Sequence, residues 1–329
     1  MYIGMYMKYL ILSTHDPYLN LAIEEYLFEN SQDNVFILWQ NEPCIVIGKN
    51  QNPYAEIDIS VAREKNIKIV RRITGGGAVY HDLGNLNYTF ISNDGAGGID
   101  FAKFTEPIIS ALGNMGISAT LSGRNDIEVD GKKISGNAQC KKRGRVLHHG
   151  TLLFDSDLEF LSGVLSVDRE KIQAKAIKST RARVTNIKGL LSVPCDINEF
   201  IRLISEYVIA EFSAEPLNLE INEQIKDLAM RNSSSEWLFP TREYLSSYNI
   251  RKKKRYPFGT LEVYLDMSND VIKSAKILGD FFGSDDISVI ENALSGKRLS
   301  EIEAALSGLC VSEYIFGMAN EDLVSHILN

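Results

Sequence analysis

Alternation of apolar and polar positions dominates the first half of the chain and predicts short β-strands. It is clearest at 67–71 and 86–90, on either side of a glycine-rich segment. The N-terminal apolar runs also predict a strand, because they are too short for a signal peptide or a membrane span. Further strands are predicted at 35–39, 44–47, 127–129 and 147–154, the first two of these as a hairpin.

Apolar positions with a helical period lie between these strands and predict flanking helices. The first helix is expected to begin at Asp16 and Pro17, a pair typical of an N-cap and a first helical residue. The other helices are predicted at 59–66, 106–115, 197–212, 221–230, 287–294, 301–309 and 320–328.

A shift in composition at 248–259 predicts a boundary between two domains. The segment contains RKKKR and Pro257, and we interpret it as a solvated linker. Two alternating runs beyond it predict a hairpin within a small α+β unit. The expected domains are therefore 1–247, which carries the chemistry, and 248–329, an accessory unit.

The overall composition argues against binding to nucleic acid or to a membrane. The chain has 329 residues, of which 44% are hydrophobic and 24% charged, as in ordinary globular proteins. Its net charge of −8 is the wrong sign for general nucleic-acid binding, so RKKKR alone would have to carry such a role. The four cysteines form no CxxC pair, which favours reduced thiols in a cytoplasm over disulfides or a zinc site. They are Cys44, Cys140, Cys195 and Cys310.

The glycine-rich segment RRITGGGAVYHD is the first candidate for chemistry. Three consecutive glycines after a strand allow the backbone to approach a ligand closely, and their N–H groups favour an anion. The neighbouring Arg71 and Arg72 add positive charge, and His81 and Asp82 follow on the other side. The alternative is a glycine-rich hairpin without a ligand. The segment matches neither GxxxxGK[ST] nor GxGxxG, so a Walker or Rossmann site is excluded.

A second candidate lies in the predicted hairpin around Asp130 and Gly131, a turn typical of paired strands. Lys133 starts the return strand, and Gly136 interrupts it where a close approach is expected. Lys133 is either a functional cation or a solvated hairpin lysine. His148 and His149, as neighbours on a strand, should face opposite sides, so they do not form a metal pair.

The segment 168–186 is strongly basic within an acidic protein. It predicts either a solvated helix and loop or a cationic flap that folds over a polyanionic ligand. Arg181 and Arg183 belong to it.

Taken together, these motifs resemble those of the bacterial lipoate–protein ligases. RRITGGGAVYHDLGN is similar to the family's lipoate-binding loop and GKKISGNAQ to its lysine motif. HHGTLLFDSDL, TRARVTN and SSSEW follow in the family's order. The resemblance covers nearly the whole chain. It implies an α+β fold with a mixed or antiparallel sheet of the biotinyl/lipoyl-ligase, class II synthetase-like type, flanking helices and a small α+β C-terminal domain.

The resemblance also implies a two-step reaction. Lipoate and ATP would form lipoyl-AMP, and the lipoyl group would pass to a lysine of a carrier domain. Expected carriers are the 2-oxoacid dehydrogenase E2 subunits and the glycine-cleavage H protein, with the ligase itself a monomer. Lys133 is the implied catalytic residue, Mg²⁺ is expected with ATP, and Asp126 is the candidate metal ligand. The implied ATP- and lipoate-binding residues are Arg72, Thr74, Gly75, Gly76, Gly77, Ala78, Val79, Tyr80, His81, Asn85, Asp126, Lys133, Ser135, Gly136, Ala138, His149, Arg181 and Arg183.

One departure and several rival functions accompany this resemblance. Cys140 stands where the best-known members carry an arginine, although Lys141, Lys142 and Arg143 could substitute for it. The nearest rival is an ATP-independent octanoyl- or lipoyl-transferase, which would need a cysteine nucleophile. A biotin ligase would need a different loop. A non-catalytic binder of lipoate or carrier domains would not need Lys133.

Overall fold

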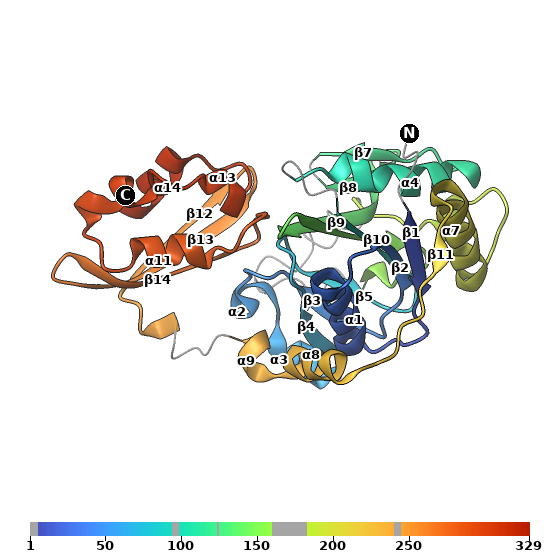
Figure 1. Ribbon diagram of the computed structural model, residues 1–329, viewed down its shortest axis with the longest axis horizontal. Coiled ribbons are helices and arrows are strands. Elements are labelled where there is room, and N and C mark those ends of the chain that lie inside the picture. The colour runs from blue at the N-terminus through green and yellow to red at the C-terminus, as the bar shows by residue number, and fades with distance from the viewer. Residues whose placement is uncertain (1–5, 94–98, 124, 160–182, 240–244) are drawn as a thin grey trace.

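The computed structural model describes residues 6–93, 99–123, 125–159, 183–239 and 245–329 (Figure 1). The chain forms two lobes, a larger one drawn from blue to gold and a smaller one, after residue 245, drawn from orange to red. Within the described residues, no helix is long and apolar enough to cross a membrane.

The larger lobe is built on an eight-stranded mixed sheet. Its strand order is β11-β1-β2-β6-β10-β9-β8-β7, with β1 parallel to β2 and β11 and the other neighbours antiparallel. The mixed α+β architecture predicted from the sequence is therefore confirmed. The strands are β1 (Met7–Ile11), β2 (Asn34–Trp39), β6 (Asn85–Ser92), β7 (Thr120–Ser122), β8 (Asp126–Val129), β9 (Lys132–Lys142), β10 (Arg145–Leu153) and β11 (Glu215–Pro216).

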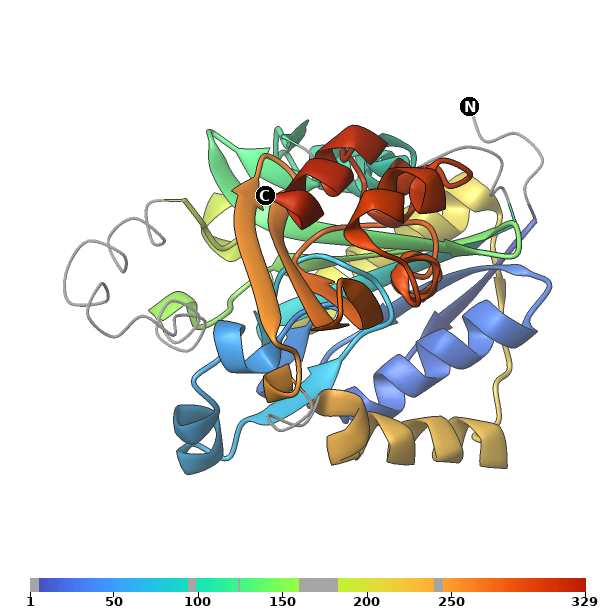
Figure 2. The same ribbon diagram turned by 90° about the vertical axis from the view of Figure 1, so that its left-hand side faces the viewer.

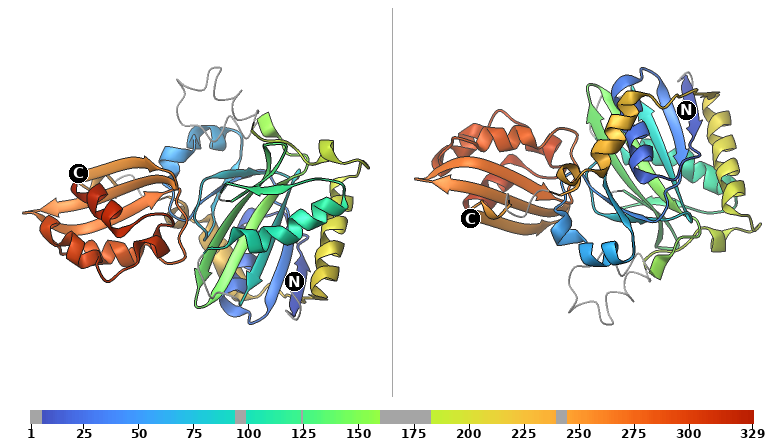
Figure 3. Two further views of the ribbon diagram at one scale, coloured as in Figure 1. Left: turned by 90° about the horizontal axis from the view of Figure 1, so that it is seen from above. Right: turned by 90° about the horizontal axis from the view of Figure 1, so that it is seen from below.

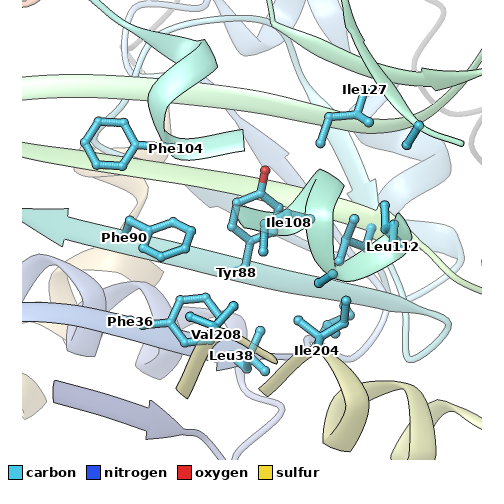
Figure 4. Packing of buried hydrophobic residues seen from close by; sticks show 14 of the residues in the cluster. Phe36, Leu38, Tyr88, Phe90, Phe104, Ile108, Leu112, Ile127, Ile204 and Val208 are labelled. Atoms are coloured by element: carbon cyan, nitrogen blue, oxygen red, sulfur yellow. The ribbon is translucent and has the colours of Figure 1, made fainter. Parts of the chain in front are cut away.

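One face of this sheet is covered by α4 (Phe101–Asn114) and α7 (Ile197–Phe212), which lie side by side (Figure 3). Their apolar residues pack against Tyr88 and Phe90 of β6 (Figure 4). Because strand residues alternate between faces, Asn85, Asn87 and Thr89 point to the other side. The apolar residues of the alternation predicted at 86–90 thus lie in the core, and the polar residues between them form a row on the opposite face of the sheet.

That opposite face carries α1 (Pro17–Asn30), α8 (Glu223–Ser233) and a second, three-stranded sheet. This sheet has the order β4-β3-β5, with β3 (Cys44–Ile47) between β4 (Lys68–Arg71) and β5 (Val79–His81). Asp16 caps α1 by accepting a bond from Tyr18 N, as predicted.

The predicted hairpin of 35–39 with 44–47 is wrong, although both segments are strands. β2 already pairs with β1 and β6 on its two edges, so β3 has no free edge to join. β3 pairs instead with β4 and β5 in the second sheet. The glycine-rich segment therefore links two strands of the small sheet, β4 and β5.

The smaller lobe contains the antiparallel strands β12 (Ile250–Tyr256), β13 (Gly259–Ser268) and β14 (Val271–Gly279). Its helices pack on this sheet around a separate apolar core (Figure 2). The helices are α11 (Ser288–Leu294), α12 (Ile302–Leu306), α13 (Val311–Tyr314) and α14 (Asn320–Leu328). Shorter elements of the chain are α2 (Pro53–Glu56), α3 (Ile59–Glu64), α9 (Ser235–Leu238) and 3₁₀ turns at Lys188–Leu190 and Leu299–Glu301.

The predicted linker at 248–259 is also wrong, because RKKKR forms the edge strand β12. Arg251 and Lys253 both pair with Glu262, a carboxylate that is only 3% exposed. Glu56 of α2, in the larger lobe, lies within electrostatic reach of Lys253 and Arg255. The basic run thus pairs with the buried Glu262 and lies near Glu56 of the larger lobe, and its charge needs no nucleic acid to explain it.

Candidate functional site

A cavity lies between the polar face of the large sheet, the glycine loop and the smaller lobe. Its lining of apolar residues and a few polar side chains is typical of a site for a small molecule. Half of the predicted site residues line it: Arg72, Gly77, Ala78, Val79, His81, Lys133, Gly136, Ala138 and His149. Sequence reasoning missed other lining residues, among them Leu21, Trp39, Asn87, Thr151 and Phe282.

Lys133 lies at one end of the cavity. The hairpin of β8 and β9 forms as predicted, with Asp130 and Gly131 at positive φ in the turn. Lys133 Nζ is 2.8 Å from Asp126 Oδ1, and a third of its side chain is exposed. A Cβ added to Gly136 would lie 2.8 Å from Nζ, so the glycine leaves room for the lysine itself. The close approach predicted at Gly136 is therefore that of Lys133.

The end of the basic segment holds Lys133 from the backbone side. Lys133 N donates to Arg183 O at 2.7 Å, and Thr185 N donates to Lys133 O at 3.0 Å. The exposed Arg183 thus sits beside Lys133 in space, although it is not among the residues that line the cavity. Arg181 and most of the predicted flap at 168–186 lie outside the described residues.

Arg72 organises the glycine loop. It is 5% exposed, and its guanidinium donates to Thr74 Oγ1 and to the carbonyl oxygens of Val46, Gly75 and Gly77 at 2.7–3.2 Å. Burial lowers the pKa of Arg72 to about 10. With these partners, Arg72 shapes the loop, and its predicted contact with a ligand stays a prediction.

Arg71 is likewise occupied by the backbone. It donates to the carbonyl oxygens of Gly48, Lys49 and Gln51, and to those of Trp237 and Leu238. Trp237 ends the SSSEW turn, in which Ser234 caps α9, and Leu238 follows it. Arg71 and this distant motif therefore meet in one structural contact.

The smaller lobe closes the loop side of the cavity. Gly76 N donates to Phe281 O at 3.1 Å, and a Cβ on Gly76 would lie 2.6 Å from the ring of Phe282. Gly76 also has φ +90°, which an L side chain rarely adopts. Phe282 is 2% exposed and packs with Phe101 and Ala138. The triple glycine thus permits a contact between the lobes as well as a loop around a ligand.

A buried polar chain joins α1 to the loop across the cavity wall. Glu24, 2% exposed, accepts bonds from Thr89 Oγ1 at 2.7 Å and from His149 Nδ1 at 2.9 Å. His149 Nε2 contacts Thr74 Oγ1 at 2.8 Å, and Thr74 Oγ1 accepts from Arg72. Glu24 was missed, because the helix buries a face that differs from the one its apolar residues predicted and that includes Asn20, Leu21, Glu24, Leu27 and Phe28.

The remaining predicted residues lie behind the cavity wall or beside it. Tyr80 pairs with Ile45 in the small sheet, and burial raises its pKa to about 12. Asn85 donates to Asn87 Oδ1 at 2.8 Å, and Ser135 is fully buried beside Asn137. Thr74, Gly75, Gly76 and Asp126 support the lining residues described above.

Cys140 does not offer a nucleophile. Its side chain packs with the apolar cluster under α1, and it is not among the residues that line the cavity. Burial raises the pKa of its thiol to about 12, which disfavours the reactive thiolate.

Comparisons with known proteins place the chain among its relatives. The model of the lipoyl protein ligase A/B catalytic domain matches residues 16–209, and that of the bacterial lipoate protein ligase C-terminus matches 246–327. The chain belongs to the lipoate–protein ligase family. It is 40% identical to the Bacillus subtilis lipoate-protein ligase LplJ over 326 residues, which cover 95% of this chain and 97% of that protein. It is also 40% identical to Staphylococcus aureus lipoate–protein ligase 1, over 94% of this chain and 96% of that one.

Solved structures agree with this assignment. Lipoate-bound LipL1 of P. falciparum superposes with a TM-score of 0.81 over 98% of this chain and 99% of that one, and at 24% identity it supports the fold alone. A lipoate-protein ligase A bound with ATP gives a TM-score of 0.58 at 26% identity, over 71% of this chain and 98% of that one. The chain is thus a lipoate–protein ligase with the fold of its family, and the sequence-based resemblance is confirmed.

Proposed function

We propose that this ligase joins lipoate to ATP in the cavity beside Lys133 and passes the lipoyl group from lipoyl-AMP to a carrier lysine. The observation that carries the site assignment is the position of Lys133. Its Nζ lies above Gly136 at one end of a cavity whose walls include Leu21, Val46 and Val79. A cation at the end of an apolar cavity suits an acid whose tail is apolar and whose head is charged.

The two chemical steps both require positive charge at this point. In the first, the lipoate carboxylate attacks the α-phosphorus, an acyl–phosphate bond forms, and pyrophosphate leaves. Two anions approach each other, so a fixed ammonium offsets their repulsion and the charge of the transition state. In the second, the carrier's amine attacks the acyl carbonyl and AMP leaves. Lys133 Nζ can then donate to the developing oxyanion. Asp126 holds Nζ in place, at 2.8 Å.

We propose that Mg²⁺ enters with ATP and is held mainly by the phosphates. Among the described residues, no group of three or more His, Cys, Asp or Glu side chains could bind a metal. Asp126 is the carboxylate beside Lys133, and its Oδ2 is not the atom that pairs with Nζ. A single carboxylate suits Mg²⁺, which keeps several waters and binds through one or two carboxylates plus substrate phosphates. The ion would neutralise phosphate charge.

We further propose lipoyl carrier domains as the acceptors, namely 2-oxoacid dehydrogenase E2 subunits and the glycine-cleavage H protein. One named structural neighbour pairs a bipartite lipoate protein ligase with its E2 lipoyl domain. We expect two domains, at 1–247 and 248–329, since the smaller lobe has its own core. We also expect the ligase to be a monomer. The four free thiols favour a cytoplasmic location.

The test is lipoate-dependent exchange between ATP and labelled pyrophosphate without a carrier. We expect exchange with the parent protein and with Lys132→Ala, the matched control, because Lys132 is the exposed neighbour on the same strand. Lys133→Ala should remain folded but lose at least about 100-fold in rate, the order lost with one charge-stabilising donor. Normal exchange by Lys133→Ala would overturn the role given to Lys133.

The same assay separates the ligase from its transferase rival. If folded parent protein gave no exchange but moved an acyl group between carriers without ATP, the ligase proposal would fail. The environment of Cys140 argues against that outcome, because its partly buried thiol packs with an apolar cluster and does not line the cavity.

A further inference from the structure

Two buried polar side chains on the cavity wall each have a nitrogen atom without a hydrogen-bond partner among the described residues. His81 and Asn87 are 3% and 1% exposed, and both line the cavity. His81 Nε2 and Asn87 Nδ2 have no partner among the described residues. A buried polar atom without a partner destabilises the fold, so two at one site point to a ligand that supplies the missing bonds.

The neighbours of His81 define Nε2 as a donor. Asn20 Nδ2 donates to Asn41 Oδ1 at 2.9 Å, so the amide nitrogen of Asn41 is the atom that faces His81 Nδ1 at 3.1 Å. His81 Nδ1 therefore accepts, and the ring proton resides on Nε2. Burial, together with Arg72 and His149, lowers the pKa of His81 to about 3, so the ring is neutral near pH 7.

Asn87 offers a second donor. Its Oδ1 accepts from Asn85 Nδ2 at 2.8 Å, which leaves both protons of Nδ2 without a partner. The pair Nε2–H and Nδ2–H therefore calls for an acceptor.

Strand register places these donors far from Lys133. Asn87 is paired with Trp39 on one side and with Thr151 on the other. Thr151 Oγ1 in turn accepts from Gly136 N at 3.1 Å, where Lys133 Nζ lies. Asn87 is thus two strands from Gly136, roughly 10 Å at the usual strand spacing. The rings of His81 and Trp39 are 6.0 Å apart, so His81 lies at the same distant end.

The length of the acyl chain matches this separation. With carbon–carbon bonds near 1.5 Å and ordinary angles, an extended chain advances roughly 1.3 Å per bond. If the carboxyl carbon lies at Lys133, carbons 6 to 8 lie roughly 6–9 Å further along. Those carbons carry the two sulfurs of lipoate, whereas octanoate has only hydrocarbon there. Sulfur is a weak acceptor and hydrocarbon is none.

We propose that His81 and Asn87 form a donor pair that recognises the sulfur end of the substrate, so that the ligase selects cyclic disulfide acids over straight-chain fatty acids of the same length. This inference rests on the function proposed above. An acid without an acceptor at its far end leaves both donors unsatisfied, which is how a polar site rejects an analogue that lacks the matching group.

The first test uses the parent protein and three acids in the pyrophosphate exchange assay: lipoate, octanoate and a carbocyclic analogue with methylene groups in place of both sulfurs. We expect kcat/KM for lipoate to exceed both others by roughly tenfold, the value of about one hydrogen bond. The carbocycle matches lipoate in shape, so equal kcat/KM for the two would overturn the proposal. No exchange with any acid would instead refute the proposed function.

The second test assigns the preference to the two residues. Asn87→Leu and His81→Phe each remove a donor and keep an apolar volume, and we expect each to shrink the ratio of lipoate to carbocycle. Thr105→Val is the control, because it removes a buried hydroxyl that bonds within α4, away from the cavity. Its ratio should stay that of the parent. An unchanged ratio in both cavity variants, with unfolding transitions that prove them folded, would overturn the assignment.

Discussion

His148 provides a direct test of how burial controls a titrating group in this fold. It faces away from His149, as the strand alternation predicts, and is 0% exposed. Its ring stacks on Phe104 with centroids 5.2 Å apart and lies 5.8 Å from Phe101 and 6.1 Å from Tyr88. Neither ring nitrogen has a partner within the described part of the chain. Burial, with a smaller effect of His149, holds the pKa of His148 well below its usual range.

We expect His148→Phe to stabilise the protein at neutral pH and to reduce its sensitivity to acid. Each unsatisfied buried nitrogen costs about 1–3 kcal/mol, while the larger ring adds about 1–3 kcal/mol of overpacking. The two nitrogens together outweigh the overpacking, so the net gain near pH 7 should be about 2 kcal/mol. The aromatic neighbours on three sides favour a phenyl ring.

The pH dependence follows from linkage. The native pKa is lowered, so below pH 6.5 the unfolded chain binds a proton that the native protein does not. Stability is thus present above the unfolded pKa and falls as the pH drops, with a slope of up to about 1.4 kcal/mol per pH unit for this group. His148→Phe removes that contribution. His81, whose pKa is also lowered, remains and keeps part of the slope.

The assay is urea unfolding followed by circular dichroism at pH 7, 6 and 5. The slope of unfolding free energy against pH should be smaller in His148→Phe than in the parent. His15→Gln, at an exposed histidine, is the control for removing a histidine as such. A variant with the parental slope would show that His148 does not remain neutral in the native protein, and the reasoning from burial would be refuted.

Three further predictions concern residues of the larger lobe. Glu24→Leu leaves the Thr89 hydroxyl and His149 Nδ1 without their partner, so the free energy of unfolding should fall by about 2–5 kcal/mol; a loss below about 1 kcal/mol in urea would contradict the buried chain. Gly76→Ala places a Cβ against Phe282 at positive φ, and we expect a lower Tm and slower lipoate-dependent exchange. Cys140→Ser should keep its exchange and carrier lipoylation within about twofold, since the thiol is not in the cavity; loss of acyl transfer would revive the transferase function.

Local signals predicted the elements that depend on local physics. Asp130 and Gly131 both take positive φ, which is what a tight hairpin turn requires, and the lysine strand follows as expected. Asp16 and Pro17 begin α1, and the apolar period of 197–212 matches α7 residue for residue. In each case the residues that determine the turn or helix lie within the same short stretch of sequence that forms it.

Pairings between distant segments were not accessible in the same way. Two apolar runs near each other were expected to pair, but β2 takes both of its partners from elsewhere in the chain. RKKKR was assigned to a linker because its charge suggested exposure to solvent. In the structure it forms β12, where Lys253 pairs with Glu262 of β13 and Arg255 with Asp280, the residue after β14. Strand pairings and ion pairs of this kind depend on residues far apart in sequence, and composition alone does not reveal these partners.

The roles of Arg72 and the glycines were underestimated for a related reason. Residue type predicted positive charge and free N–H groups, but the guanidinium bonds to the loop's own carbonyl oxygens. Gly76 donates its N–H to the smaller lobe. These bonds add a structural role to the predicted one, and contact of Arg72 and the glycines with a ligand stays a prediction.

The contact between lobes also bears on how a carrier reaches the acyl group. Phe282 is 2% exposed and closes the loop side, where its burial is worth about 1.5–3 kcal/mol. Backbone bonds reinforce it, from Gly76 N to Phe281 O and from Gly279 N to Asn50 O. The Lys133 and Asp126 side chains, by contrast, are 33% and 32% exposed. We therefore expect an acceptor lysine to approach on the side of Lys133, where the proposed site places the acyl carbonyl.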